Sequence, residues 1–479
     1  MNILLINSNR LKHPWPVIPF GQCAVAAALE EVGHDVVFLD LCFSKNTDRE
    51  IRLALSKFKP ELVGVGIRNI DNASGYNTIF FIEQTKVEVI NPLKSAFEGP
   101  IVIGGAAVGI SGAEILHFFD LTLAIQGDGE RSMVELSARL EKNLPLSGLG
   151  GLILRQDGMI IEENPPLPVT DMNALPSIKF ARYLDVQRYR KYNSPLQIQT
   201  KRGCALRCVY CTYNRLEGSV YRFKDPLRVA NEVETLVHET GIRHIEFTDS
   251  TFNIPLDHAK AVLRAIAVKG LNLRCRALGL NPSAVDEELV KLMKRVGFQD
   301  VDLGVESGCN QTLLSLGKNF DKEDMLKAGK LLHQANIPTS WFILLGAPDE
   351  TEDTLHETLE TIAKAASPWD LVVIGVGIRV YKGAPLAKTL QQTNRDGIND
   401  NFLSPVHFEP KAIDIQTIKK ITKRAYRRYP NFLIYNDKSQ YPEVILKAAS
   451  VVLKLFFPQQ PIWRVYIFVR KILQTLGVD

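Results

Sequence analysis

Short apolar runs alternate with stretches of helical periodicity along the N-terminal part of the chain. Such an alternation is typical of buried parallel strands joined by crossover helices. A helix is expected over Gly21–Val32, with Gly33 at its C-terminal cap. The pattern predicts a doubly wound α/β domain over residues 1–140, with ligands at the carboxyl ends of its strands. The expected strands are Ile3–Ile6, Val36–Leu41, Leu62–Ile67, Ile101–Ile103 and Leu121–Ile125.

Residues 141–195 are expected to be a linker, because Pro165-Pro166, Pro168 and Pro176 interrupt regular structure. A second alternation follows over residues 196–395. It contains six βα units, which are too few for an eightfold barrel and predict a partial one with its active site at the strand carboxyl ends. Residues 396–479 are expected to be helical. The six barrel strands are Leu196–Thr200, His244–Thr248, Leu273–Ala277, Asp300–Gly304, Trp341–Leu345 and Leu371–Arg379.

The composition is that of a folded protein. The 479 residues allow two or three domains, and the proportions of 46% hydrophobic and 23% charged residues are ordinary for soluble proteins. A net charge of +4 gives no indication of a nucleic-acid partner. Seven clustered cysteines do not suit a disulfide framework. With neither a signal-peptide pattern nor a long uncharged apolar run, a cytoplasmic protein without a spanning helix is expected.

Three cysteines follow the first predicted barrel strand. Cys204, Cys208 and Cys211 have the spacing C-x3-C-x2-C. Cysteine thiolates are the usual ligands of iron–sulfur clusters, and three of them leave the fourth iron of a four-iron cluster without a protein ligand. Zinc is the alternative, but a closed structural site needs four ligands and no neighbouring Cys or His completes it. The loop therefore predicts a 4Fe-4S cluster.

The segment from Lys201 to Cys211 closely resembles the signature of the radical S-adenosylmethionine (SAM) superfamily, including the aromatic Tyr210 before the third cysteine. The resemblance implies that the open iron chelates the methionyl amine and carboxylate of SAM. It also implies reductive cleavage of SAM to a 5′-deoxyadenosyl radical. Tyr210 would lie against the adenine. An external electron donor such as flavodoxin or ferredoxin would supply the electron.

Further segments match the superfamily pattern. Thr248-Asp249-Ser250 follows the second barrel strand, where the family places polar groups for the SAM amine, although the family often has Gly-Gly-Glu there. Glu306 and Ser307 end the fourth strand in a segment that resembles the GxES pattern near the SAM ribose and carboxylate. Gly346 begins a turn that resembles the one on the adenine side. Cys309 could face the substrate, but a lone cysteine is usually a small buried hydrophobe.

A doubly wound domain before this barrel is similar to the cobalamin-binding subgroup of the superfamily, over roughly residues 1–395. The resemblance implies a Rossmann-like cobalamin domain, with contacts at Arg68, Gly104-Gly105 and Gly127-Asp128-Gly129-Glu130. Glycine also lets a bulky ligand approach the backbone. Ser8-Asn9-Arg10 replaces the DxHxxG motif, so that loop offers cobalt no histidine. Arg68 would approach the lower corrin face, pair with the nucleotide phosphate, or be a solvated strand-end arginine. The domain could also be a relic that has lost cobalamin.

The C-terminal residues have helical periodicity with an apolar face. They are expected either to pack onto the barrel or, together with Val444–Phe457, to form an interfacial helix that contacts a membrane peripherally. The periodic positions are Ile462, Val465, Tyr466, Val469, Leu473 and Leu476.

The resemblance implies methylation of an unactivated carbon, or of phosphorus, in a small-molecule or lipid substrate. One SAM would remethylate cobalamin and a second would yield the radical. Two alternatives stay open: ring formation or rearrangement without methyl transfer, and a non-catalytic cobalamin or cluster sensor. A methylthiotransferase acting on nucleic acid is disfavoured, because the N-terminal domain has only Cys23 and Cys42 for further clusters. The shared residues bind cofactors, so the sequence does not name the substrate.

Overall fold

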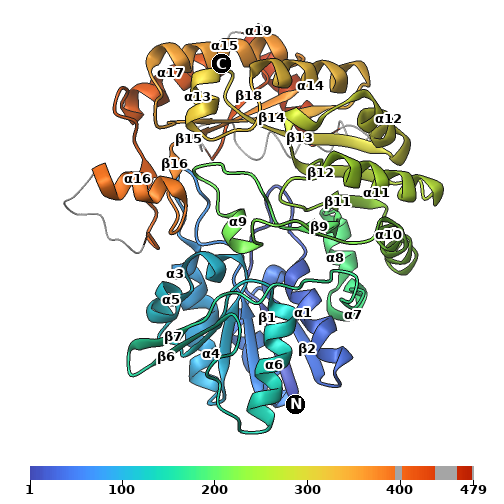
Figure 1. Cartoon of the computed structure of the whole chain (residues 1–479), viewed down its shortest axis with the longest axis vertical. Coiled ribbons are helices and arrows are strands. Elements are labelled where there is room, and N and C mark those ends of the chain that lie inside the picture. The colour runs from blue at the N-terminus through green and yellow to red at the C-terminus, as the bar shows by residue number, and fades with distance from the viewer. Residues whose placement is uncertain (394–401, 437–460, 477–479) are drawn as a thin grey trace.

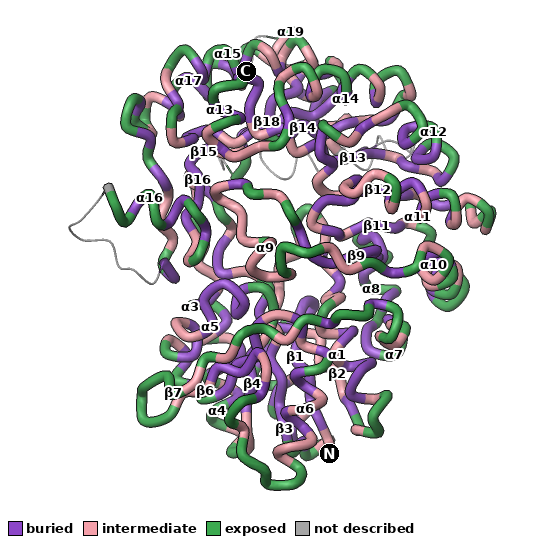
Figure 2. Tube along the Cα trace, viewed as in Figure 1, coloured by how far each residue is buried: buried purple, intermediate pink, exposed green. Residues whose placement is uncertain are grey.

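The computed structural model describes residues 1–393, 402–436 and 461–476. Two domains lie one above the other, each built on a seven-stranded sheet (Figure 1). The strands of both sheets are largely buried and the helices expose their outer faces (Figure 2). The α/β class expected from the sequence is confirmed.

The N-terminal sheet has the strand order β2-β1-β3-β4-β5-β6-β7, and its first five strands are parallel. Helices α1 and α6 pack on one face, while α2, α4 and α5 cover the other. All five expected strands are present, and the N–H of Gly33 donates to the Glu30 carbonyl at the end of α1 (3.0 Å). The elements are β1 (Asn2–Asn7), α1 (Phe20–Glu31), β2 (Asp35–Asp40), η1 (Leu41–Phe43), α2 (Thr47–Phe58), β3 (Leu62–Gly66), α3 (Phe81–Thr85), η2 (Lys86–Ile90), α4 (Asn91–Ala96), β4 (Ile101–Gly104), α5 (Ala106–Phe119), β5 (Leu123–Ile125) and α6 (Gly129–Glu141).

The N-terminal sheet continues into the segment expected to be a linker. A hairpin of β6 (Leu152–Gln156) and β7 (Met159–Glu163) adds two antiparallel strands beyond β5. Its turn is Asp157-Gly158, with positive φ at both residues, which suits a two-residue hairpin. The sequence carries this Asp-Gly signal, but the prolines that follow obscure it. Residues 141–195 are therefore partly regular structure rather than a simple linker.

The second sheet forms a partial barrel with the strand order β18-β15-β14-β13-β12-β11-β8, all parallel. The six expected strands are present. The elements are α7 (Phe180–Tyr183), α8 (Val186–Lys191), β8 (Leu196–Ile198), β9 (Lys201–Arg202), α9 (Tyr213–Leu216), β10 (Arg222–Phe223), α10 (Pro226–Thr240), β11 (His244–Phe247), α11 (Leu256–Val268), β12 (Arg274–Leu280), η3 (Pro282–Ala284), α12 (Glu287–Val296), β13 (Phe298–Glu306), α13 (Asn310–Ser315), α14 (Lys322–Gln334), β14 (Thr339–Leu345), α15 (Glu352–Ala365), β15 (Leu371–Val376), β16 (Ile378–Arg379) and α16 (Pro385–Thr393).

A seventh barrel strand comes from the region expected to be helical. After β17 (His407–Phe408) and α17 (Ile415–Arg428), the three-residue strand β18 (Phe432–Ile434) pairs in parallel with β15. The expectation of an all-helical C-terminal region is therefore wrong. A strand of three residues is too short to show an alternation of its own, and its pairing depends on the partner strand that the fold supplies.

The last described helix packs onto the barrel. In α19 (Ile462–Thr475), Tyr466 and Ile467 are buried against Leu371 and Val373 of β15. The fully buried guanidinium of Arg470 donates to backbone carbonyls at the end of α17 and the start of β18, including that of Phe432 at 2.8 Å. Of the two expectations for this helix, the structure shows the one in which it packs onto the barrel. Val444–Phe457 lies outside the described residues.

None of the helices in the described part of the chain is long and apolar enough to cross a bilayer. The two domains meet where strands of both sheets end, and α9 lies between them (Figure 1). The α9 residue Arg215 donates to the carbonyl of Gly109 in α5 (3.4 Å). The segment containing the three cysteines therefore lies at the boundary between the domains.

Candidate active site

The cysteine loop is held by backbone contacts on both sides. The N–H of Cys204 donates to the Gly218 carbonyl (3.0 Å), and that of Val209 donates to the Leu316 carbonyl (3.0 Å). Gly317 lies so close to the loop that a Cβ there would be 2.7 Å from the Arg207 carbonyl oxygen. The loop is therefore clamped between the β9–β10 ribbon and the segment after α13.

The three thiols share one buried environment. Cys204 and Cys208 are buried and Cys211 is half-buried. Burial raises the pKa of Cys208, an effect that the nearby Lys318 ammonium opposes, and it raises the pKa of Cys211 to about 11. Cysteine thiolates are the usual protein ligands of iron–sulfur clusters, in which each cysteine binds a different iron.

Tyr210 and Glu306, both expected at the SAM site, contact each other. The Tyr210 hydroxyl donates to Oε1 of Glu306 (2.8 Å). Glu306 has φ +56°, a conformation that is costly for a non-glycine residue and is often found at functional sites. The ammonium of Lys318 lies 2.8 Å from Oε2 of Glu306 and 3.5 Å from the Tyr210 hydroxyl. Lys318 has no recognisable sequence signal, because only the fold brings it to the loop.

The Thr248-Asp249-Ser250 segment braces the cysteine loop from behind. The fully buried Asp249 carboxylate accepts from the N–H and hydroxyl of Thr200 (2.7 and 2.6 Å) and pairs with the Lys201 ammonium (3.1 Å). The Ser250 hydroxyl donates to the Gly203 carbonyl (3.1 Å). Both carboxylate oxygens of Asp249 already accept hydrogen bonds, and its expected contact with the SAM amine stays a prediction. Asp249 positions the strand that leads into the loop.

Ser307 and Gly346 also shape the backbone of the site. The buried Ser307 hydroxyl lies 2.7 Å from that of Thr358 and accepts from the Cys309 N–H (3.1 Å). Gly346 has φ +103°, and its N–H donates to the buried Glu350 carboxylate. Cys309 is itself buried. These residues fix the turns at the ends of β13 and β14.

Glu350 gives the site a testable pH dependence. Burial raises its pKa from 4.5 to about 7. The folded protein therefore binds this proton more tightly than the unfolded chain does. The resulting stability is complete at acidic pH and is lost as the pH rises through about 7. We expect Glu350→Gln to flatten the fall in stability between about pH 5 and pH 8 by on the order of 2 kcal/mol.

Thermal unfolding of wild type and Glu350→Gln at the two pH values measures the effect. Glu352→Gln, two residues along and exposed, serves as the matched control and should leave the profile unchanged. Parallel profiles for wild type and Glu350→Gln would contradict the assignment.

The glycines of the N-terminal loops have packing roles. Gly105 has φ +101°, and a Cβ there would be 2.6 Å from the Ile67 carbonyl oxygen. A Cβ on Gly127, with φ +82°, would be 2.6 Å from Pro166. The close contact with Ile67 is therefore enough to require glycine at position 105, whether or not a ligand approaches the backbone there. Gly129 begins α6 and would place a Cβ 3.0 Å from Val25.

Asp128 and Glu130 contact two arginines of the β9–β10 ribbon. Asp128 lies 3.1 Å from Arg202 and 2.5 Å from Arg222, and Glu130 lies 2.5 Å from Arg202. All four side chains are almost fully buried. In this structure the arginines engage both carboxylates, and the expected role of Asp128 and Glu130 as cobalamin contacts stays a prediction.

Arg68 does lie where the resemblance places it, at the end of β3. It is exposed and lines a cavity of about 250 Å³ at the ends of β1 and β3. Although Arg68 is exposed to solvent, desolvation by the surrounding protein lowers its pKa, and the charges of Tyr213 of α9 and Glu246 of β11 oppose this effect. Arg68 thus faces the barrel across the domain boundary.

The same cavity provides a test of whether the residues suit cobalamin. Asn9 and Arg10 line it, and their Nδ2 and Nε atoms are buried without a hydrogen-bond partner. The corrin ring carries amide side chains, whose carbonyl oxygens could accept from these donors. The cavity wall therefore fits an amide-rich ligand.

The inner side of the barrel carries a charge cluster that the sequence reading missed. Arg276 of β12 contacts Glu246 (3.0 Å), Asp300 (3.1 Å) and Asp302 (2.9 Å). Burial raises the pKa of Asp302 to about 7. Trp15, from the loop after β1, lies over the guanidinium at 4.7 Å. Asp300 and Asp302 are two positions apart in β13, so the sequence indicates that both side chains lie on the same face of this strand.

Comparison with known proteins agrees with this geometry. Residues 198–362 match the family model of the radical SAM superfamily. The chain is 24% identical to an uncharacterised methyltransferase of Pyrococcus horikoshii, over 92% of this chain and 94% of that one. It is 25% identical to tryptophan 2-C-methyltransferase of Streptomyces laurentii, over 81% and 74%. The solved radical SAM methyltransferase TsrM of Kitasatospora setae, with cobalamin and a [4Fe-4S] cluster bound, shares the fold with a TM-score of 0.83, 20% identity and full coverage of both chains.

Residues 198–362 therefore form a radical SAM domain, which includes the cysteine loop. The overall fold of the chain is that of the solved structure of TsrM.

Proposed function

We propose that this enzyme uses a 4Fe-4S cluster, SAM and cobalamin to methylate an unactivated carbon, or phosphorus, of a small-molecule substrate. The observation that carries the proposal is the position of the three-thiol loop. It lies at the barrel mouth next to the boundary with the doubly wound domain, and Tyr213, two residues after Cys211, lies near Arg68 of that domain. A sensor would need no such convergence of both domains on one reaction space.

The cofactors have identifiable partners in this chain. Cys204, Cys208 and Cys211 would bind the cluster, and Tyr210 and Glu306 would border SAM. The loops after β1 and β3 would contact the cobalamin. When bound, the cluster with SAM supplies a hydrogen-abstracting radical and cobalamin supplies the methyl group. The protein contributes position and shielding from side reactions.

The residues around this space would orient the substrate. Arg276, held by three carboxylates, presents a fixed charged wall, and Trp15 covers it from the N-terminal domain. Phe342 of β14 is 39% exposed, an unusual value for an aromatic side chain on a central strand. A substrate with both polar and apolar parts suits such a lining.

Two products test the function. Anaerobically reconstituted protein with SAM, hydroxocobalamin and a reductant should form both 5′-deoxyadenosine and S-adenosylhomocysteine. The first reports SAM cleavage at the cluster, and the second reports methyl transfer. Formation of neither product would overturn the proposal. With methyl-deuterated SAM, a product without label would favour the ring-forming alternative.

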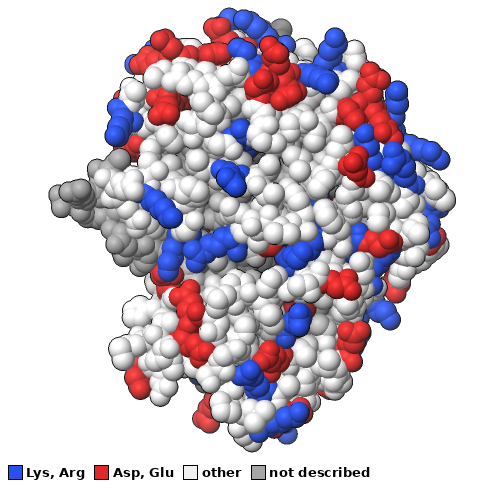
Figure 3. Space-filling view, viewed as in Figure 1, with Lys and Arg blue, Asp and Glu red and all other residues white. Residues whose placement is uncertain are grey.

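We place the enzyme in the cytoplasm, where a flavodoxin or ferredoxin would donate the electron. In the space-filling view, acidic and basic side chains are interspersed over the visible face (Figure 3).

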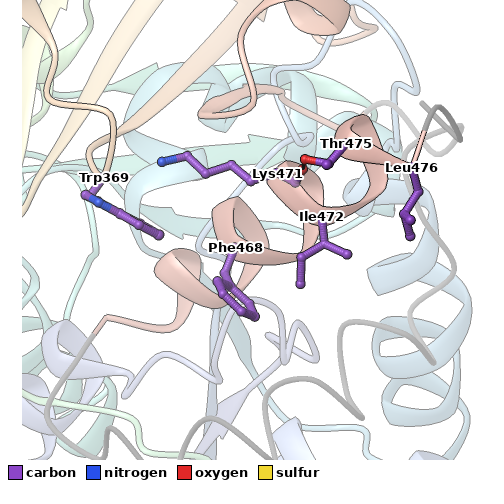
Figure 4. A pocket seen from close by; sticks show the side chains of 6 residues that line it. All are labelled: Trp369, Phe468, Lys471, Ile472, Thr475 and Leu476. Atoms are coloured by element: carbon purple, nitrogen blue, oxygen red, sulfur yellow. Dashed lines mark hydrogen bonds between the residues drawn. The ribbon is translucent and has the colours of Figure 1, made fainter.

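An apolar groove of about 310 Å³ lies between α19 and Trp369. Figure 4 shows Phe468 and Ile472 pointing the same way from this helix, with Lys471 extended toward Trp369. This groove is the surface through which the C-terminal helix would contact a membrane, and so reach a lipid substrate.

Vesicle binding tests the membrane contact. We expect Phe468→Ser combined with Ile472→Ser to lower the fraction bound to anionic vesicles about tenfold, because two exposed apolar side chains are lost. The control is Val268→Ser, which removes an even more exposed apolar side chain from α11. Flotation that is equal in all three proteins, or absent in wild type, would exclude this contact.

A further inference from the structure

Four buried charged side chains connect the two domains at the cysteine loop. Arg202 is the last residue of β9, two positions before Cys204, and Arg222 is on β10 opposite it. Asp128 and Glu130 lie at the start of α6 in the N-terminal domain. We call these four residues the interdomain ion cluster.

The cluster is fully hydrogen-bonded. Arg202 contacts Glu130 through both terminal nitrogens (3.2 and 2.5 Å), and its Nε donates to Gln199 (2.9 Å). Asp128 also accepts from the Val169 N–H (2.8 Å). The two-point contact between a guanidinium and a carboxylate fixes direction as well as distance. A buried pair of this kind is weak evidence for stability, so a role in specifying geometry is the more informative hypothesis.

A second buried ion pair joins the domains at the opposite edge of the barrel. Arg379 of β16 lies 2.7 Å from Asp71, which follows β3. Both side chains are nearly inaccessible to solvent. This pair lies far along the chain from the cysteines, whereas the interdomain ion cluster holds the ribbon from which the cysteine loop emerges. The two contacts therefore allow docking of the domains to be separated from placement of the loop.

We propose that Arg202 and Glu130 are positioning residues that hold the cysteine loop at a fixed position relative to the N-terminal domain. This inference rests on the proposed function, because the relative position of loop and domain matters only if each of them binds one of the reacting molecules. Even a small displacement of the reacting groups is enough to slow a reaction strongly. SAM cleavage takes place at the loop alone and does not depend on the position of the N-terminal domain. Methyl transfer between SAM at the loop and cobalamin at that domain would depend on it.

The test compares two products in Glu130→Gln, a neutral side chain of the same shape. With SAM, hydroxocobalamin and reductant, we expect the ratio of S-adenosylhomocysteine to 5′-deoxyadenosine to fall at least about tenfold. The electron paramagnetic resonance spectrum of the reduced cluster should also change. Arg202→Lys, which keeps the charge and loses the two-point contact with Glu130, should lower the ratio too. This second variant decides the matter if Glu130→Gln does not fold.

Two controls distinguish loop placement from general stability. Glu135→Gln changes an outward-facing ion pair of the same helix, and Asp71→Asn neutralises the equally buried contact at the other edge. Both should keep the wild-type product ratio and cluster spectrum. An unchanged ratio in folded Glu130→Gln or Arg202→Lys, or an equal fall in Asp71→Asn, would overturn the inference. Failure of wild type to form either product would instead overturn the proposed function.

Discussion

Cys208→Ala should lose 5′-deoxyadenosine formation altogether, a fall of at least about a thousandfold, because the cluster would lack one of only three protein ligands. Iron content and the visible absorption of the cluster should fall with it. The thiol of Cys208 is buried near Lys318, whose ammonium keeps its ion pair with Glu306 in the variant, so the loss is confined to the cluster ligand. Iron analysis and product quantification after anaerobic reconstitution measure both effects.

Cys275→Ala is the matched control for the cysteine variant. Cys275 is fully buried in β12 and belongs to the apolar core, so its loss should cost about 1 kcal/mol of stability and leave the iron content unchanged. Cys309→Ala should behave in the same way. Equal iron loss in all three variants would show that the three-cysteine loop is not the cluster site.

Arg276→Met should destabilise the fold by about 3–5 kcal/mol at pH 8, because three buried carboxylates lose their shared cation. Burial already raises the pKa of Glu246 and Asp300, and that of Asp302 to about 7. Carboxyl groups whose folded pKa is raised are accommodated best when protonated. The penalty should therefore shrink toward pH 5 and be complete above about pH 7.

Chemical denaturation of the Arg276 variant at the two pH values measures this effect. Arg264→Met serves as the control, since it removes an exposed arginine paired with Glu288 and should cost less than about 1 kcal/mol at either pH. A penalty that is independent of pH would show that the carboxylates are not titrating with the loss of the arginine.

The sequence predicts the parts of this fold that rest on local patterns. Buried parallel strands form continuous apolar runs, so all five strands of the first domain and six of the barrel are recognisable. The short strand β18 is not, because it depends on pairing with a sheet edge formed elsewhere, and the local signal of the hairpin at Asp157-Gly158 is obscured by the prolines that follow it. The cysteine loop is recognisable because its chemistry requires a fixed spacing along the chain.

The side-chain network around the site is less predictable. Lys318 reaches Tyr210 from more than a hundred residues along the chain, as their separation of 108 shows. Asp249 and Glu130 stand in segments typical of cofactor loops, yet each carboxylate is engaged by a basic side chain of the barrel. A motif fixes the residue type and its approximate place, whereas the partner of a carboxylate depends on which cation the fold brings within reach.

The central claim is that cluster and cobalamin act together in this chain. Its most direct test is to supply methyl-deuterated SAM to anaerobically reduced protein, with and without cobalamin, and to follow both SAM products and the label. We predict 5′-deoxyadenosine in both samples, and S-adenosylhomocysteine with label on the bound cobalamin only where cobalamin is present. S-adenosylhomocysteine formed equally without cobalamin, or cobalamin that stays unlabelled while SAM is cleaved, would contradict the account.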